Sequence, residues 1–300
     1  MDDALVTTGL RKTFRGGRVA LRGLDLAVPT GSVFGYLGPN GAGKTTTIRL
    51  VAGLLRPTAG SARVLGLDVE RHRDEVQRRL GYLPGRFVGY GDLTVDRYLQ
   101  YLASLRGGVD TATVRSLLER FQVETDRRIA TLSHGNQQKV GIVQAFMHRP
   151  DLVVLDEPTQ GLDPIMQQEF LTLVREQSGT GTTVFLSSHV LSEIQAAADI
   201  VAILRAGELV TTATVAELRD QQVRRWDLTF TGPAPLDALR SCPGVSELSA
   251  HGRVAHLSLA GSADRLLRTA APYGIEDVTT HEADLTDVFL RFYEDEPCPA

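Results

Sequence analysis

Short apolar runs alternate along this chain with longer stretches in which apolar residues recur at helical spacing. The runs predict strands at 4–10, 18–28, 33–37, 61–65, 80–83, 152–155, 182–186 and 200–204. Helices are predicted at 43–54, 71–79, 164–177 and 190–198 and over most of 94–148, where Asp110 or Thr111 is a candidate N-cap. The first two strands predict an antiparallel start, and the later alternation predicts a parallel sheet covered by helices. The fold class is therefore α/β, with an antiparallel β subdomain and a helical lobe at about 86–148.

The order of elements changes near residue 221, after a polar run. From there the pattern predicts strand, helix, strand, strand, helix, strand, and a last helix at 284–293. The order βαββαβ is that of the ferredoxin-like fold. We therefore expect two domains, 1–221 and an accessory α+β domain at 222–300. This second domain is a candidate for dimerisation, regulation or effector binding, and equally for a structural extension without a ligand.

Composition narrows the class of protein. With 42% hydrophobic residues, the 300-residue chain can bury a large core. A net charge of −4 gives no electrostatic footprint for nucleic acid. The two cysteines form no metal or disulfide pattern, and no apolar run approaches the ~20 residues that cross a bilayer. The N-terminus also lacks the layout of a signal peptide. We expect a cytoplasmic protein whose membrane role, if it has one, depends on a partner chain.

A glycine-rich loop between the strand at 33–37 and the next helix carries the strongest chemical signal. Its sequence is Gly38-Pro39-Asn40-Gly41-Ala42-Gly43-Lys44-Thr45-Thr46, which fills the P-loop pattern. Glycines let backbone N–H groups turn inward as an anion nest, and the helix N-terminus adds partial positive charge. Lys44 is placed to contact outer phosphates and Thr45 to ligate Mg²⁺. The loop therefore predicts a P-loop NTPase core.

Two acids follow the apolar run at 152–155, directly before Pro158. A fully buried parallel strand has such a run, and ligands of open α/β sheets bind at its carboxyl end. Asp156 can hold Mg²⁺, either directly or through water. Glu157 can orient and deprotonate an attacking water.

Three further segments resemble a known family. They are Thr131-Leu132-Ser133-His134-Gly135-Asn136-Gln137-Gln138-Lys139, then Gly161-Leu162-Asp163-Pro164, then Ser187-Ser188-His189. With the P-loop and the acid pair, their order resembles the ATP-binding subunit of an ABC transporter over about residues 5–220. Two stretches, Tyr82-Leu83-Pro84-Gly85 and Asp284-Leu285-Thr286-Asp287-Val288-Phe289-Leu290, together with the Ser-His-Gly-Asn signature, resemble bacterial drug- or antibiotic-export ATPases more narrowly.

The resemblance implies roles for further residues. Ser133 and the Gly135 N–H would reach the γ-phosphate of ATP held by the P-loop of a second copy. His189 would contact the γ-phosphate and the region of the catalytic water. Phe14 stands where the family has a Tyr that stacks on adenine, and Asp163 matches the acid that links the two sites of the dimer.

Three positions depart from the family pattern. His134 stands where Gly is the commonest residue of the family, and the change is tolerated only if this position does not need φ > 0. Asn136 replaces a Gln, and Gly85 stands where a Gln usually ligates Mg²⁺. Water can replace that side chain, because Mg²⁺ keeps waters readily.

The resemblance implies an ATPase with ATP and Mg²⁺ as cofactors, which energises export through a separate integral-membrane subunit. It would dimerise when ATP binds and lie on the inner face of the membrane through its partner, without binding nucleic acid. The alternative is a soluble ABC-type ATPase that acts on nucleic acid or ribosomes, but such proteins usually carry tandem cassettes, a long coiled coil or zinc ligands. A GTPase switch would leave the signature and Ser-Ser-His segments without a role. The transported substrate cannot be inferred from this chain.

Overall fold

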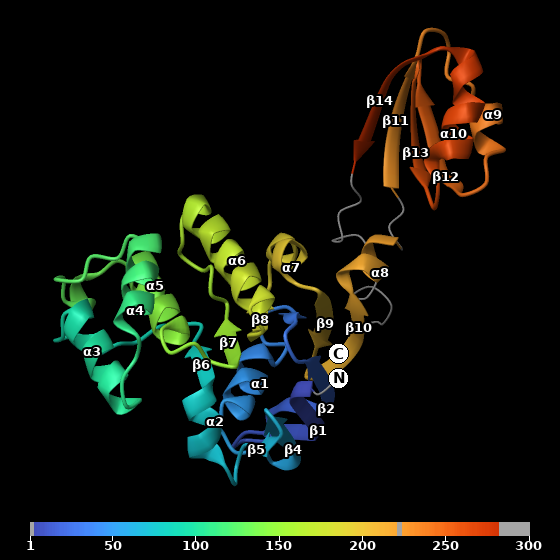
Figure 1. Cartoon of the computed structure of the whole chain (residues 1–300). Helices are drawn as coiled ribbons and strands as arrows, with labels where there is room; N and C mark the ends of the chain where they lie inside the picture. The colour runs from blue at the N-terminus through green and yellow to red at the C-terminus, as the bar shows by residue number, and fades with distance from the viewer. Residues whose placement is uncertain (1–2, 221–223, 282–300) are drawn as a thin grey trace. The chain divides into compact units, whose positions relative to one another are not determined.

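The computed structural model describes residues 3–220 and 224–281, which fall into two compact units (Figure 1). The first unit ends at Thr214 and the second begins at Val215. The helix predicted at 284–293 and the segment from Asp284 to Leu290 lie outside the described residues. No helix in the described ranges is both long and apolar enough to cross a membrane.

A six-stranded sheet forms the centre of the first unit, in the order β10-β9-β3-β8-β7-β6. The five strands from β9 to β6 run parallel, as predicted, and β10 pairs antiparallel with β9 at one edge. Every residue of β3, β7 and β8 is buried, which explains their continuous apolar runs. The strands are β3 (Val33–Leu37), β6 (Leu80–Leu83), β7 (Leu152–Asp156), β8 (Thr183–Ser188), β9 (Ile200–Arg205) and β10 (Glu208–Thr214).

Helices cover both faces of this sheet. On one face, α1 (Lys44–Val51) packs in a core with Phe34, Tyr36 and Phe185. On the other face, α7 (Leu191–Ala197) approaches so closely that a Cβ on Gly35 would lie 2.5 Å from Ile194 Cγ2. Here α7 packs on α6 (Pro164–Gly179). Because successive strand residues face opposite sides, Phe34 and Gly35 place the two groups of helices on opposite faces.

The antiparallel start predicted from 4–10 and 18–28 is confirmed as part of a second sheet, in the order β2-β1-β4-β5. Its apolar side joins the core under α1. The strands are β1 (Asp3–Thr13), β2 (Val19–Pro29), β4 (Ala59–Val64) and β5 (Leu67–Asp68).

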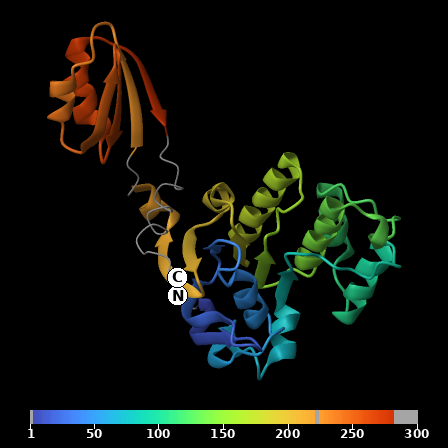
Figure 2. The same cartoon turned by 180° about the vertical axis from the view of Figure 1, so that it is seen from behind.

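Residues between β6 and β7 are mostly helical, as predicted. In both views these helices gather at the end of the sheet away from β9 and β10 (Figure 2). Side-chain caps begin three of them: Thr94, Asp110 and Ser133 each accept a backbone N–H. The helices are α3 (Val95–Leu105), α4 (Thr111–Arg120), η1 (Ile129–Thr131) and α5 (His134–Phe146), while α2 (Arg73–Arg79) precedes β6.

The second unit has one antiparallel sheet in the order β12-β13-β11-β14. Trp226, Leu228 and Phe230 alternate with polar residues on β11 and form a core with Leu239 and Leu266, which come from two helices of this unit. The elements are α8 (Val215–Asp220), β11 (Arg224–Phe230), α9 (Leu236–Arg240), β12 (Val245–His251), β13 (Val254–Leu259), α10 (Ala263–Ala270), η2 (Ala271–Tyr273) and β14 (Ile275–His281).

Candidate active site

The glycine loop joins β3 to α1, and two of its glycines have no room for a side chain. A Cβ on Gly38 would lie 2.4 Å from the Leu204 carbonyl oxygen, and one on Gly43 would lie 2.7 Å from that of Ala20. Gly43 also has φ +116°, in the left-handed region, directly before α1 begins. The loop therefore delivers the first turn of α1, with its unpaired N–H groups, to one point at the end of β3.

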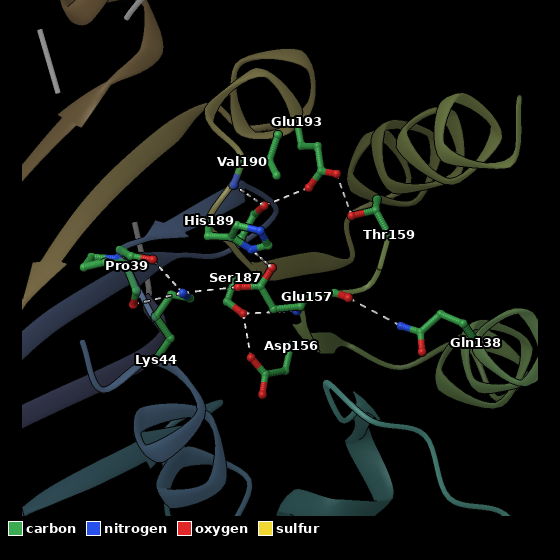
Figure 3. Close-up of polar contacts among 12 residues, drawn as sticks. Pro39, Lys44, Gln138, Asp156, Glu157, Thr159, Ser187, His189, Val190 and Glu193 are labelled. Carbon is green, nitrogen blue, oxygen red and sulfur yellow. Dashed lines mark hydrogen bonds and ion pairs between the residues drawn. The ribbon is translucent and has the colours of Figure 1, made fainter. Parts of the chain in front are cut away.

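Lys44 is buried beneath this loop (Figure 3). Its Nζ donates to the carbonyl oxygens of Gly38 at 2.5 Å and Pro39 at 3.4 Å. The same nitrogen lies 3.2 Å from Glu157 Oε1. The ammonium group is thus held between the P-loop and the end of β7.

A cavity of about 270 Å³ opens on the loop. Its wall combines the predicted loop residues with Arg18, Ala20 and Glu157, which come from other parts of the chain. Phe14 is not part of this wall; its ring is 37% exposed, with Lys12 Nζ 5.4 Å from its centroid. Gly38 and Ala42 are buried behind the cavity. The loop residues that line it are Pro39, Asn40, Gly41, Gly43, Lys44, Thr45 and Thr46.

Asp156 ends β7 with its side chain buried, and its Oδ1 accepts a hydrogen bond of 2.8 Å from Ser187 Oγ. Among the described residues, no Lys, Arg or His forms an ion pair with this carboxylate. A buried carboxylate without a cation is costly, so the position suits a divalent metal ion. Mg²⁺ uses hard oxygen ligands and often only one or two carboxylates with phosphates, which fits Asp156 and the Thr45 hydroxyl.

Glu157 lies next to His189 at the ends of β7 and β8. Its Oε2 is 2.6 Å from His189 Nδ1, while its buried Oε1 makes no hydrogen bond in the described part of the chain. Glu157 has φ +49°, which is strained for a residue with a side chain. The Ser187 carbonyl and hydroxyl oxygens, both at 3.2 Å, accept from the Glu157 N–H. The carboxylate is therefore fixed between a cation and an imidazole.

Two polar residues that the sequence did not single out support these loops. Gln138 of α5 is fully buried, and its Nε2 donates to the carbonyl oxygen of Pro158 at 3.0 Å and to that of Glu157 at 3.5 Å. Glu193 of α7 accepts from Thr159 Oγ1 and Ser188 Oγ, both at 2.7 Å. Apart from Ser188, their partners lie 19 to 34 positions away along the chain, so no local spacing marks these two residues.

The signature segment lies against the loop before α6, not at the cavity. Ser133 caps α5, and its Oγ accepts from Asn136 N at 3.3 Å. A Cβ on Gly135 would lie 2.4 Å from the Gly161 carbonyl oxygen. His134 is the first residue of α5 and is not among the residues with positive φ, so the departure from Gly costs no backbone strain.

Asp163 also serves a helix N-terminus. Its Oδ1 accepts from Met166 N at 3.0 Å, which caps α6. Neither this residue nor Ser133 or Gly135 lines the cavity at Lys44. One chain therefore brings together the P-loop, Asp156, Glu157 and His189, and holds the signature residues elsewhere.

Gly85, which stands where the family pattern has a Gln that ligates Mg²⁺, lies beside Asp156. A Cβ here would come within 3.2 Å of Asp156 Oδ2, and the φ of Gly85 is outside the left-handed region. Nearby, burial and then the negative charge of Asp156 raise the pKa of Tyr82. A side chain at position 85 would therefore begin in close contact with the Asp156 carboxylate.

Comparisons with known proteins show the family of this chain. The model of the ABC transporter family matches residues 21–160. The bacitracin transport ATP-binding protein BcrA of Enterococcus faecalis is 33% identical over 299 residues, covering 97% of this chain and 96% of that protein. The daunorubicin/doxorubicin resistance ATP-binding protein DrrA of Streptomyces peucetius is 40% identical over 223 residues, covering 72% of this chain and 67% of that protein.

Solved structures show the same fold. One described as the ATP-binding subunit of an ABC transporter has a TM-score of 0.67 and 30% identity, and the match covers 72% of this chain and 92% of that one. A dimeric ATP-binding cassette in a post-hydrolysis state, bound to ADP and Pi, has a TM-score of 0.65 over 70% of this chain and 98% of that one. At 21% identity the second structure supports the fold alone.

Proposed function

This chain belongs to the ABC transporter family as an ATP-binding subunit with ATPase activity, and from that premise we propose that Lys44, Glu157 and His189 carry the chemistry. The observation that carries the proposal is the Glu157 carboxylate, held 3.2 Å from Lys44 Nζ and 2.6 Å from His189 Nδ1 at the wall of the cavity. A base in this position can take a proton from a water that attacks the outer phosphorus.

The P-loop binds the phosphates of ATP in this proposal. Loop N–H groups and the N-terminus of α1 contact phosphate oxygens, and Lys44 exchanges its bonds to the Gly38 and Pro39 carbonyls for bonds to the outer phosphates. Thr45 and Asp156 would hold Mg²⁺, which supplies positive charge that offsets the charge developing on the transferred phosphate. His189 contacts the γ-phosphate and keeps the Glu157 carboxylate in place. Phe14 stacks on the adenine ring from outside the cavity.

A complete site takes two copies of the chain. Ser133 and Gly135 are held against the loop before α6, away from the cavity of their own chain. The first N–H groups of α5 have no helical partner, so the N-terminus of this helix can receive an anion. In the proposed homodimer it covers the γ-phosphate held by the second copy, and Asp163 lies between the two sites.

An integral-membrane subunit completes the transporter. Exposed apolar residues that fit such a partner lie on the first unit: the rings of Tyr90 and Tyr101 are 5.8 Å apart, and Leu105 follows one helical turn after Tyr101 and is 66% exposed. The relatives named for bacitracin transport and for daunorubicin/doxorubicin resistance favour export of a drug-like compound. The protein would then work at the inner face of the membrane.

The region from 222 onward is proposed to be a separate accessory domain with a ferredoxin-like fold. Its elements β11-α9-β12-β13-α10-β14 follow the βαββαβ order, and neighbouring strands are antiparallel throughout. The described residues that line the cavity at Lys44 all belong to the first unit. A chain truncated before it should therefore keep ATP binding.

Glu157→Gln tests the proposed base. The change keeps the shape of the side chain and removes its ability to take a proton, so ATP hydrolysis should fall by ~10²-fold or more. ATP binding should persist, and size-exclusion chromatography with ATP and Mg²⁺ should show a dimer. Glu119→Gln, on an exposed face of α4, is the matched control. Turnover within about twofold of wild type, or strictly monomeric elution of the Gln variant, would count against the proposal.

A further inference from the structure

Glu193 accepts two short hydrogen bonds, one from the loop after β7 and one from the end of β8. Its Oε1 accepts from Thr159 Oγ1 and its Oε2 from Ser188 Oγ, each at 2.7 Å (Figure 3). Thr159 and Ser188 are buried, whereas Glu193 stands in the first turn of α7. One carboxylate thus joins the segment after β7 to the end of β8.

These two segments carry or adjoin the residues proposed for catalysis. Thr159 follows Glu157 by two positions, and Ser188 directly precedes His189. Ser188 Oγ also accepts from Val190 N at 2.9 Å, so the chain on either side of His189 is tied to the same carboxylate. The bridge through Glu193 therefore runs parallel to the direct bond between Glu157 and His189.

We propose that Glu193 is a positioning residue that keeps Glu157 and His189 within hydrogen-bonding distance. The inference rests on the proposed function, since it gives Glu193 a role only through those two residues. Glu157 needs such support, because its φ of +49° persists only where the surroundings hold the backbone. Without the bridge, the segment after Glu157 loses a buried anchor at Thr159.

The bridge needs a side chain that can hydrogen-bond to two hydroxyl groups at once. An ionised carboxylate accepts only, so both hydroxyl groups can donate to it, and hydrogen bonds to a charged acceptor are the stronger kind. A Gln side chain keeps one acceptor oxygen, and its NH₂ group can donate to the second hydroxyl, whose oxygen also accepts. Glu193→Gln should therefore retain the bridge, while Glu193→Ala removes it.

The test compares steady-state ATP hydrolysis and equilibrium ATP binding of the full chain. Because a small misplacement of reacting groups can cost about 10²-fold, Glu193→Ala should lower kcat by roughly 10- to 100-fold. ATP affinity should stay within about twofold, because the P-loop is untouched, and Glu193→Gln should keep kcat within about threefold. Ser192→Ala, one position away and exposed, is the matched control.

A second set of variants keeps the test valid if Glu193→Ala folds poorly. Thr159→Val removes one bond at nearly constant volume, and Ser188→Ala removes the other. Each should lower kcat, and the loss in the double variant should be smaller than the sum of the two, since residues in one network are coupled.

Two results would overturn the inference. One is a kcat within about twofold of wild type for folded Glu193→Ala; the other is a loss of kcat matched by an equal loss of ATP binding, which marks a merely structural residue. Glu157→Gln measured in parallel separates this failure from that of the proposed function. If Glu157→Gln abolishes turnover while Glu193→Ala does not, only the role of Glu193 is refuted; if Glu157→Gln turns over normally, both proposals fall.

Discussion

Replacing Gly135 by Ala adds a single methyl group at the tightest backbone contact of the signature segment. The new Cβ would lie 2.4 Å from the Gly161 carbonyl oxygen, whereas ordinary contact begins near 3.4 Å. The two backbones must therefore separate by about 1 Å. Gly161 cannot easily give way, because it has φ +81° and a Cβ position already filled by the His134 ring.

The expected cost has two parts. Overpacking of this kind typically costs about 1–3 kcal/mol, and the higher helix propensity of Ala recovers at most about 1 kcal/mol. The net loss in free energy of unfolding should be about 1–2 kcal/mol. If Gly135 contacts the γ-phosphate of a second copy, a displacement near 1 Å should also lower ATP hydrolysis by ~10²-fold.

Urea unfolding followed by circular dichroism measures the first part, and steady-state hydrolysis measures the second. Gly179→Ala is the control, since Gly179 lies in α6 with no atom within 4 Å of its Cβ position and without positive φ. It should be neutral or slightly stabilising, with full activity. Equal stability and equal turnover for the two Ala variants would refute the reasoning about the contact between Gly135 and Gly161.

Three further predictions follow from the structure. Gly85→Gln should lower the Mg²⁺ concentration that gives half-maximal hydrolysis, and the variant should retain activity. The reason is that the added side chain starts 3.2 Å from Asp156 Oδ2 and needs no strained backbone. A variant that is folded but inactive in a Mg²⁺ titration would contradict this. Arg120→Met should cost about 0.5–1.5 kcal/mol in urea unfolding, after a discount for the exposure of both carboxylates. The guanidinium pairs with Glu169 and Glu176 of α6 and lowers the pKa of Glu176, so an unchanged midpoint would argue against that link between α4 and α6. Burial, and then the charge of Arg106, lowers the pKa of His148 to about 4, so the folded state favours the neutral ring and stability should fall as pH drops from 6.5 towards 4. After a discount for partial exposure, His148 should account for about 1–2 kcal/mol of the unfolding free energy that is lost between pH 7 and pH 5. Urea unfolding of His148→Gln at these two pH values should therefore show a smaller loss than wild type.

The core strands were predictable because their environment leaves a simple pattern. Strands β3, β7 and β8 are buried on both faces, so their sequences are continuous apolar runs. Strand β10 was not predicted, since it is an edge strand that is at most half-buried and rich in Thr. Strand β5 has only two residues and α8 only six, which is too few for a periodic pattern to appear in the sequence.

The site residues also divide into those that sequence patterns could identify and those that only the folded structure reveals. The P-loop and the acids after β7 could be found from sequence, because a glycine loop before a helix and acids after a buried run are local features. Arg18, Gln138 and Glu193 could not, because each acts on a segment brought near it only by folding. Whether His134 could replace Gly also depended on the structure. The residue with positive φ is Gly161, and the His134 ring lies against it.

Three elements hold Glu157 or the residues next to it by hydrogen bonds, and these bonds connect the proposed base to other parts of the site. Ser187 of β8 fixes its N–H, Glu193 of α7 anchors the segment that follows, and Gln138 of α5 binds its carbonyl oxygen and the next one. Gln138 lies little more than one turn from Ser133 on the same helix. A shift of α5 that accompanies anion binding at its N-terminus would therefore pull directly on the backbone of Glu157.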